Sequence, residues 1–344
     1  MELQFEPDYL RVAYFCSNLF AEPCAVSITS LFENNAIFRE IEVYVISDGI
    51  TEADQNKIKS IAERYSRKVS ILPSPKPEEY FQDRRFSTAT LGHTFGRMII
   101  GDLLPDDVPR VLCLDSDMLI VDSLYELWNT DLLDCYIAGV DSAPGLEMMK
   151  KTLHMEPGTL YCNGGMLLMD LSAIRRDGIE HKYKEYIMNV FDSGKVLGAY
   201  EEEVINKCTQ SKSLKLHPRY NLMTVNIVMD YDSFVKFRGA INYYSKVEME
   251  QAVRHPAIIH AINTFYIQKR IWEKDTDSPY ASEYKQYRAK TPWNDMPFIV
   301  IDRSPKQILI KKVWHIIPRR ISFHFAAIVR NNIRPLLVKK RDDE

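Results

Sequence analysis

The first half of the chain alternates short apolar runs with segments in which apolar residues recur at helical spacing. Four runs have the length of buried strands: Val12–Cys16, Glu42–Ile46, Val69–Leu72 and Arg110–Leu114. Helical spacing predicts helices over Pro23–Glu33, from Thr51 onward and over His93–Leu104. This alternation predicts an α/β fold in which a mostly parallel central sheet is flanked by helices on both faces.

The second half has a less regular pattern. Tyr136–Val140 and Gly165–Met169 have the composition of strands, while Lys182–Phe191 and Glu201–Cys208 have helical spacing. From about residue 270 onward, Tyr, Pro and charged residues dominate, and no clear period remains. Ligands of parallel sheets bind beyond the carboxyl ends of the strands, so polar residues that directly follow the predicted strands are the first candidates for function.

Composition narrows the class of protein. The 344 residues suffice for two domains or one large one, and 46% apolar with 26% charged residues is ordinary for a globular chain. The six cysteines have no C-x-x-C spacing, and several lie in apolar runs, which indicates reduced, buried thiols in a cytosolic protein. The N-terminus is acidic and polar, unlike a signal peptide, and no run of 18 apolar residues could span a membrane.

Several well-known motifs are missing from the sequence. No two glycines are separated by a single residue, which excludes the G-x-G-x-x-G dinucleotide fingerprint. Gly96 and Gly101 have the spacing of a P-loop, but Asp102 follows them where a P-loop has lysine. Neither G-x-S-x-G nor H-E-x-x-H occurs, so the usual signals of α/β hydrolases and zincins are absent too.

The formal net charge of −3 hides two oppositely charged parts. Residues 303–341 contain eleven Lys or Arg and no acid, and three acids then end the chain. The preceding 302 residues contain 33 basic and 44 acidic residues. Apolar and cationic residues alternate within this basic stretch, around Trp314 and Phe325, as in segments that lie on an anionic bilayer. A helix packed on the body with a cationic outer face is the alternative, and no nucleic-acid-binding motif accompanies the charge.

The sharpest chemical feature is Asp115-Ser116-Asp117, which directly follows the predicted strand that ends at Leu114. Two carboxylates one residue apart at the end of a strand can point at one place and share a hard divalent cation, which often completes its shell with substrate phosphates. Taken alone, the pattern also fits a solvated turn after a strand.

Motifs along residues 10–295 together resemble glycosyltransferase family 8. The stretches that resemble it are Val12–Phe20, Asp115–Asp117, Tyr161–Gly165, Glu201–Asn206 and His260…Trp272. The family comprises retaining, metal-dependent enzymes that use nucleotide sugars, and it includes bacterial lipooligosaccharide galactosyltransferases and glycogenin. The resemblance implies a GT-A-type nucleotide-sugar-binding fold.

The resemblance also implies roles for individual residues. Asp115 and Asp117 would hold Mn²⁺ or Mg²⁺ against the donor diphosphate, with His260 as the third ligand; imidazole suits Mn²⁺ better than Mg²⁺. Further residues would contact the donor: Arg97 beside it, Ser116 between the two aspartates, and a turn formed by Asn163, Gly164 and Gly165, where glycine lets the backbone approach a sugar closely.

Three positions depart from the family pattern. Glu201 and Glu202 occupy positions where the family usually has an Asp followed by Gln. By position, the resemblance implies that Glu201 binds donor-sugar hydroxyls and that Glu202 faces the anomeric carbon. The alternative is that these acids form a solvated first turn of a helix. At the nucleotide end the usual acid is missing. The aligned residues that could contact the base are Ser17, Asn18 and Phe20. After His260 the family usually has Gly and then Lys-Pro-Trp, whereas this chain has extra residues and no Gly there, so either Lys269 or Arg270 could clamp the diphosphate.

The sequence therefore predicts a retaining hexosyltransferase. It would move a hexose from a UDP-sugar, UDP-glucose or UDP-galactose, to a cell-surface glycan or lipid-linked oligosaccharide, as in lipopolysaccharide or capsule synthesis by a bacterium. A catalytic domain at 1–300 and a membrane-associating segment at 301–344 would place it on the cytoplasmic face of the membrane. The alternatives are a haloacid-dehalogenase-like phosphatase that uses Asp115 as nucleophile, and a non-catalytic adaptor with the same fold.

Overall fold

A computed structural model places most of the chain. It describes residues 5–87, 91–142, 150, 153–155, 159–194, 197, 200–238, 242–262, 269–305, 308–309, 312 and 316–317. The predicted basic segment beyond residue 317, with Phe325, and also Trp314 therefore lie outside the described residues.

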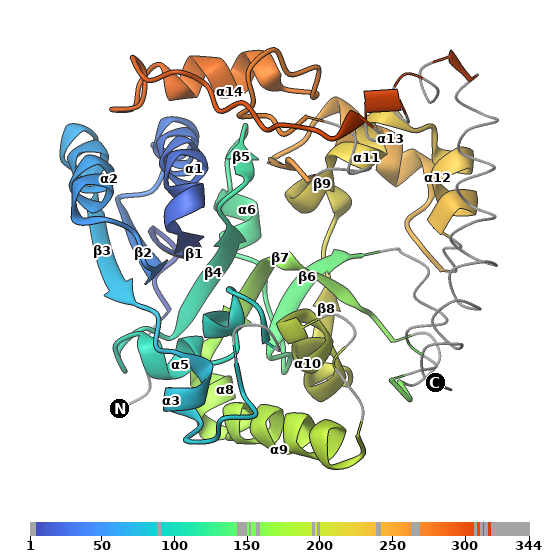
Figure 1. Ribbon diagram of the computed structural model, residues 1–344. Helices are drawn as coiled ribbons and strands as arrows, with labels where there is room; N and C mark the ends of the chain where they lie inside the picture. The colour runs from blue at the N-terminus through green and yellow to red at the C-terminus, as the bar shows by residue number, and fades with distance from the viewer. Residues whose placement is uncertain are drawn as a thin grey trace.

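A seven-stranded sheet forms the centre of the described part of the chain, in the order β3-β2-β1-β4-β7-β6-β8 (Figure 1). The strands are β1 (Tyr9–Ser17), β2 (Glu40–Asp48), β3 (Lys68–Pro73), β4 (Arg110–Asp115), β6 (Ile137–Asp141), β7 (Cys162–Asp170) and β8 (Ser213–Lys215). All neighbouring pairs are parallel except those made by β7, which runs antiparallel to β4 and β6. The predicted mostly parallel α/β sheet is thus confirmed.

The strands are apolar on both faces, and this is why they appear in the sequence as continuous runs instead of alternating ones. Along β1, Val12 and Tyr14 belong to one core and Ala13 and Phe15 to the other. Helices cover both faces (Figure 1): α1 (Ala21–Asn34), α2 (Glu52–Arg64) and α14 (Ala281–Arg288) on one side, and α5 (Ile100–Leu103), α8 (Leu171–Arg176), α9 (Ile179–Asp192) and α10 (Tyr200–Thr209) on the other.

A smaller sheet continues the region that follows β4. It consists of β5 (Met118–Ile120), β10 (Ile258–His260) and β9 (Leu222–Met223), with β10 in the middle. Short helices surround it: α11 (Thr224–Val228), α12 (Tyr231–Arg238) and α13 (Lys246–Arg254), the last of which begins with a capping box between Ser245 and Glu248. The remaining short helices are α3 (Pro77–Tyr80) and α6 (Tyr125–Trp128).

The structure corrects several local predictions. Residues 93–104 do not form one helix: a 3₁₀ turn at Phe95–Arg97 and the short α5 replace it, because Gly96 packs against Phe15 and Ile46 and glycines weaken a helix. Asn163–Gly165 is not a turn but lies in β7. Helix α14 lies in the part of the chain where the pattern gave no period.

Two expectations about composition have a structural counterpart. All six cysteines are free, four of them buried, as their positions in apolar runs suggest. In the described part of the chain, no helix combines the length and the apolar character needed to cross a bilayer.

Candidate active site

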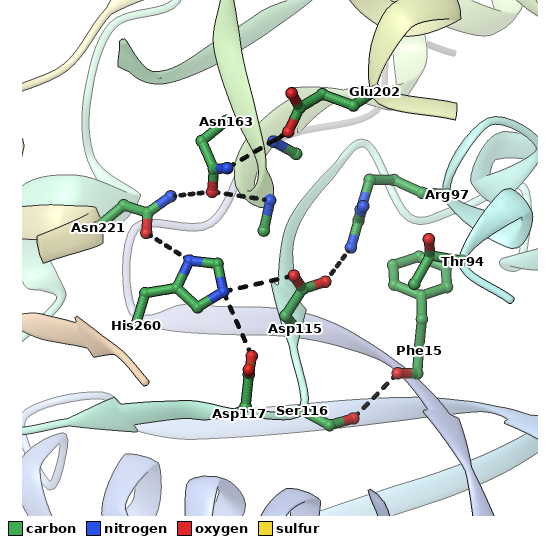
Figure 2. Close-up of polar contacts among 12 residues, drawn as sticks. Phe15, Thr94, Arg97, Asp115, Ser116, Asp117, Asn163, Glu202, Asn221 and His260 are labelled. Carbon is green, nitrogen blue, oxygen red and sulfur yellow. Dashed lines mark hydrogen bonds and ion pairs between the residues drawn. The ribbon is translucent and has the colours of Figure 1, made fainter. Parts of the chain in front are cut away.

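Strands β4, β7 and β10 bring polar residues together at one end of the strands of the main sheet. Asp115 ends β4, and because β7 runs in the opposite direction, its first residues lie beside that same end, with Leu114 opposite Met166. The second sheet completes the group, since His260 at the end of β10 pairs with Met118, next to Asp117. Figure 2 shows these side chains directed toward one another.

Asp115, Asp117 and His260 form a group with the composition of a metal site. One ligand atom from each lies within 4.8 Å of the others. His260 Nε2 is 3.3 Å from Asp117 Oδ1 and 3.6 Å from Asp115 Oδ2. Two carboxylates and one imidazole suit Mn²⁺ or Mg²⁺, with the nitrogen favouring Mn²⁺. The converging ligand atoms therefore fit the divalent cation that the family resemblance implies.

The charged side chains of this group shift one another's pKa values. Burial alone would lower the pKa of His260, but the carboxylates of Asp117 and Asp115 outweigh it and raise that pKa. Burial would raise the pKa of Asp117, yet the charges of His260 and Arg270 outweigh it and lower the pKa. The lowered pKa keeps the Asp117 carboxylate ionised beside the imidazole, and an ionised carboxylate attracts a cation.

Arg97 links this group to the acids of α10. Its side chain is fully buried, with Nη2 2.5 Å from Asp115 Oδ1 and Nη1 3.0 Å from Glu201 Oε1. Burial alone would lower the pKa of Arg97, but the two acids reverse that effect. The guanidinium also lies over the Phe15 ring at 4.9 Å, so the cation is held from three sides.

The acids at the start of α10 are not a solvated helix turn. Glu201 is buried and accepts hydrogen bonds from Arg97 and from the Thr94 hydroxyl. Glu202 Oε2 accepts from the Gly164 N–H at 2.7 Å and from Asn163 Nδ2 at 3.3 Å. Burial raises the pKa of Glu201, and it raises the pKa of Glu202 to about 7. The site therefore contains one carboxylate that titrates near neutral pH.

The two glycines of β7 are required for space. A Cβ at Gly165 would lie 2.4 Å from His260 Cε1 and 2.8 Å from Asp115 Oδ2, closer than real contacts allow. A Cβ at Gly164 would lie 3.3 Å from Arg97 Nη1. The backbone of β7 thus forms one wall of the site because it carries no side chains at these positions.

The remaining predicted residues are only partly brought together. Ser116 is buried and donates its hydroxyl to the Phe15 carbonyl, so it stabilises the turn. At the end of β1, Asn18 Oδ1 accepts from the Thr51 N–H. Phe20 packs edge-on against Trp272 with ring centroids 5.6 Å apart. Ser17 pairs in register with Asp48 of β2.

The two candidate phosphate clamps lie in different places. Arg270 Nη1 is 3.3 Å from Asp117 Oδ2. It therefore lies beside the group formed by Asp115, Asp117 and His260, called the metal-type group below. Lys269 donates instead to the backbone carbonyls of Lys274 and Asp275. The structure therefore brings Arg270 into the site and leaves Lys269 apart from it.

Sequence reasoning missed Asn221 and Thr94. Asn221 is buried and bonds to both His260 and Asn163, while Thr94 bonds to Glu201. Asn221 directly precedes the apolar pair of β9, so the position of a polar residue at the boundary of an apolar run was the one available signal.

A protein-family model for glycosyl transferase family 8 matches residues 11–265, about three quarters of the chain. This chain belongs to glycosyltransferase family 8. Its relatives include General stress protein A of Bacillus subtilis, 24% identical over 83% of this chain and 96% of that protein. A putative glycosyltransferase of Haemophilus influenzae is 26% identical over 62% of this chain and 63% of that protein.

Two solved glycosyltransferase structures share the fold of this chain. The galactosyltransferase LgtC, in complex with donor and acceptor sugar analogs, has a TM-score of 0.65 at 20% identity, covering 82% of this chain and 96% of that one. The bifunctional glycosyltransferase WbbM has a TM-score of 0.69 at 16% identity, covering 86% and 52%. The GT-A-like fold is confirmed, and the protein is a glycosyltransferase rather than a phosphatase or an adaptor.

Proposed function

We propose that this glycosyltransferase transfers a hexose from a UDP-sugar, UDP-glucose or UDP-galactose, with retention of anomeric configuration, to a glycan or lipid-linked acceptor. The observation that carries the proposal is the convergence of Asp115, Asp117 and His260 within 4.8 Å, beside the acids Glu201 and Glu202. The group of Asp115, Asp117 and His260 is suited to a diphosphate held through a cation, and Glu201 with Glu202 is suited to a sugar.

The metal-type group would handle the leaving diphosphate. Mn²⁺ or Mg²⁺ bound by Asp115, Asp117 and His260 would supply positive charge against the charge that develops on the diphosphate. Arg270 lies next to Asp117 and is partly exposed, so its guanidinium can turn to the phosphates while it remains in the site. Arg97 is too deeply buried to move and instead keeps Asp115 in place.

The acid pair would handle the sugar. Glu201, fixed by Arg97 and Thr94, presents a carboxylate for sugar hydroxyls, and Glu202 is assigned to the face of the anomeric carbon. There its carboxylate stabilises the positive charge that develops as the diphosphate leaves. One structural neighbour is a variant of LgtC with an active-site glutamine replaced by glutamate, and the present chain has glutamate at the position where the family usually has glutamine.

Asp48 offers the carboxylate that is missing at the end of β1. It stands in register with Ser17 on the neighbouring strand, is partly exposed, and lies 2.7 Å from His93 Nδ1. A carboxylate accepts the N3–H of uracil, and Phe20 supplies an aromatic face nearby in the chain. We therefore include Asp48 with Ser17, Asn18 and Phe20 in the proposed base site.

The segment after α14 supports peripheral attachment to an anionic membrane. It exposes a series of large apolar side chains: Met296, Val300, Ile301, Ile308, Leu309 and Ile316. Arg303 within this series pairs with the buried Glu273 at 2.7 Å, so the segment is anchored to the body up to that residue. A truncation that tests the membrane role should therefore remove residues 306–344 and retain Arg303. It removes Ile308, Leu309, Ile316 and the basic residues after them, so it should preserve donor hydrolysis and strongly weaken sedimentation with anionic vesicles.

A panel of nucleotide sugars, scored for nucleoside diphosphate release with Mn²⁺ and no acceptor, tests the enzymatic function. UDP-glucose or UDP-galactose should be hydrolysed slowly, and Asp117→Ala should abolish that release. Asp134→Ala, an exposed aspartate outside the site, is the matched control and should keep normal release. Normal turnover by Asp117→Ala would disprove the metal assignment, and NMR of the product anomer decides between retention and inversion.

A further inference from the structure

Asn221 connects the metal-type group with the acid pair (Figure 2). It ends a 3₁₀ turn at Pro218–Asn221 and is 2% exposed. Its Oδ1 lies 3.0 Å from His260 Nδ1, and its Nδ2 donates to Asn163 Oδ1 at 2.8 Å. Asn163 Nδ2 in turn donates to Glu202 Oε2. Two amides therefore form an unbroken hydrogen-bonded chain from His260 to Glu202.

The ends of this chain determine the direction of every hydrogen bond in it. An ionised Glu202 can only accept, and the Gly165 N–H donates to Asn163 Oδ1 at 3.2 Å. The amide nitrogen of Asn163 therefore faces Glu202, and its oxygen faces Asn221. Asn221 must then present its nitrogen to Asn163 and its oxygen to the histidine ring. Because a carbonyl oxygen only accepts, the Nδ1 atom of His260 carries a proton.

We propose that Asn221 is a positioning residue that holds His260 in the tautomer able to bind a metal and, at the same time, orients Asn163 toward Glu202. The inference rests on the proposed function, because it assumes a cation at Asp115, Asp117 and His260. With Nδ1 engaged by Asn221, Nε2 is the ring nitrogen left to bind a metal, and it lies 3.3 and 3.6 Å from the two aspartates. Without Asn221, Nε2 would be free to carry the proton and donate it to a carboxylate, leaving no lone pair for a metal.

Two substitutions separate the two roles of Asn221. Asn221→Ala removes both hydrogen bonds, and loss of such an outer partner of a ligating histidine lowers metal affinity by about 10–100-fold. Asn221→Asp keeps an acceptor for Nδ1–H but loses the donor to Asn163. It should keep Mn²⁺ affinity within about threefold of the original while kcat falls and KM changes little. Mn²⁺ affinity is measured on the full chain by electron paramagnetic resonance.

Asn35→Asp is the matched control for burying a carboxylate. Asn35 is fully buried in another part of the fold and uses both ends of its amide, donating to the Leu31 carbonyl and accepting from the Leu124 N–H. Asn35→Asp should leave the Mn²⁺ affinity unchanged and should not lower kcat selectively over KM. If Asn35→Asp reproduced the pattern of Asn221→Asp, the proposed role would be wrong.

The tautomer can be tested in the unmodified chain. In ¹⁵N-histidine-labelled protein, with the His260→Ala spectrum as the assignment control, the ring should show a hydrogen-bonded proton on Nδ1, including at alkaline pH where the ring is neutral. In Asn221→Ala this signal should be lost to exchange. An unprotonated Nδ1 in the unmodified protein would overturn the inference even if a variant failed to fold.

The controls also separate this inference from the proposed function. If His260→Ala and Asp117→Ala abolish Mn²⁺ binding while Asn221→Ala does not weaken it, the role of Asn221 is disproved and the metal site stands. If neither His260→Ala nor Asp117→Ala affects Mn²⁺ binding, the metal site itself is disproved, and the inference falls with it.

Discussion

The site contains two pairs of acids with different surroundings. Glu201 and Glu202 receive hydrogen bonds from Arg97, Thr94, Gly164 and Asn163 within the protein. Asp115 and Asp117 pair with the guanidinium groups of Arg97 and Arg270, and each also faces Nε2 of His260. Glu202 is held by neutral N–H donors and burial raises its pKa to about 7, whereas the partly exposed Asp115 and Asp117 converge with His260 within 4.8 Å and can share a cation. We therefore propose that the same side-chain chemistry serves sugar contact in one place and metal binding in the other.

Among the described residues, Arg97 is the side chain that bonds to both pairs, and removing it should have the largest effect. Arg97→Ala leaves the buried Glu201 and the partly exposed Asp115 without their cation, which should destabilise the fold by about 3 kcal/mol in denaturant unfolding. Arg39→Ala, an exposed arginine paired with Glu6 and Glu40, is the control and should cost no more than about 1 kcal/mol. Equal losses for the two variants would show that the acids do not depend on Arg97.

Glu202→Gln tests whether the sugar-side acid acts through its charge. The amide keeps the size of the side chain but not the negative charge, so kcat should fall about 100-fold or more while UDP binding is unchanged. Glu203→Gln is the matched control: Glu203 is buried one residue further along α10 and accepts from the Tyr186 hydroxyl, away from the site. A Glu202→Gln enzyme with normal kcat would show that an amide suffices.

The same substitution should stabilise the metal-free protein at high pH. Burial raises the pKa of Glu202 from 4.5 to about 7, so between these values the folded state binds a proton that the unfolded state has released. The contribution of Glu202 to stability is therefore largest below about pH 4.5 and falls as the pH rises through about 7, by about 3 kcal/mol in total. Glu202→Gln should remove this fall. Parallel pH–stability curves for the two proteins would contradict the assignment.

Much of the fold and part of the site could be predicted from the sequence, and the reason is physical. Strands such as β1 and β4 are buried on both faces and appear as apolar runs, and Asp115 follows directly from the position where one of them ends. The role of Asn221 could not be predicted in this way. Its partners lie 39 and 58 residues away in the sequence, and only the antiparallel course of β7 and the second sheet bring them together.

The turn predicted at Asn163, Gly164 and Gly165 is wrong for a related reason. Two adjacent glycines in sequence favour a turn, but here they are extended and make room for His260 and Asp115. The two glycines offer a matched pair of variants. Gly165→Ala should cost about 1–3 kcal/mol and weaken Mn²⁺ binding, because its Cβ would collide with both ligands. A Cβ at Gly164 would lie 3.3 Å from Arg97 Nη1 and 3.4 Å from Glu202, tight contacts but no collision, so Gly164→Ala should cost less than Gly165→Ala and leave Mn²⁺ binding less affected. Equal effects on Mn²⁺ binding would show that the wall is not tighter on the metal side.

The smallest expected difference lies between Arg270 and Lys269, which the sequence alone does not separate. Arg270 stands 3.3 Å from Asp117, so Arg270→Ala should slow diphosphate release about tenfold, through weaker stabilisation of the departing charge. Lys269 donates to two backbone carbonyls, and Lys269→Ala should change the rate by less than about twofold. Because Arg270 also pairs with a proposed metal ligand, Mn²⁺ affinity must be measured in the same variant. An unchanged affinity with a slower rate identifies a phosphate contact, whereas a changed affinity with an unchanged rate would place Arg270 on the metal side of the comparison.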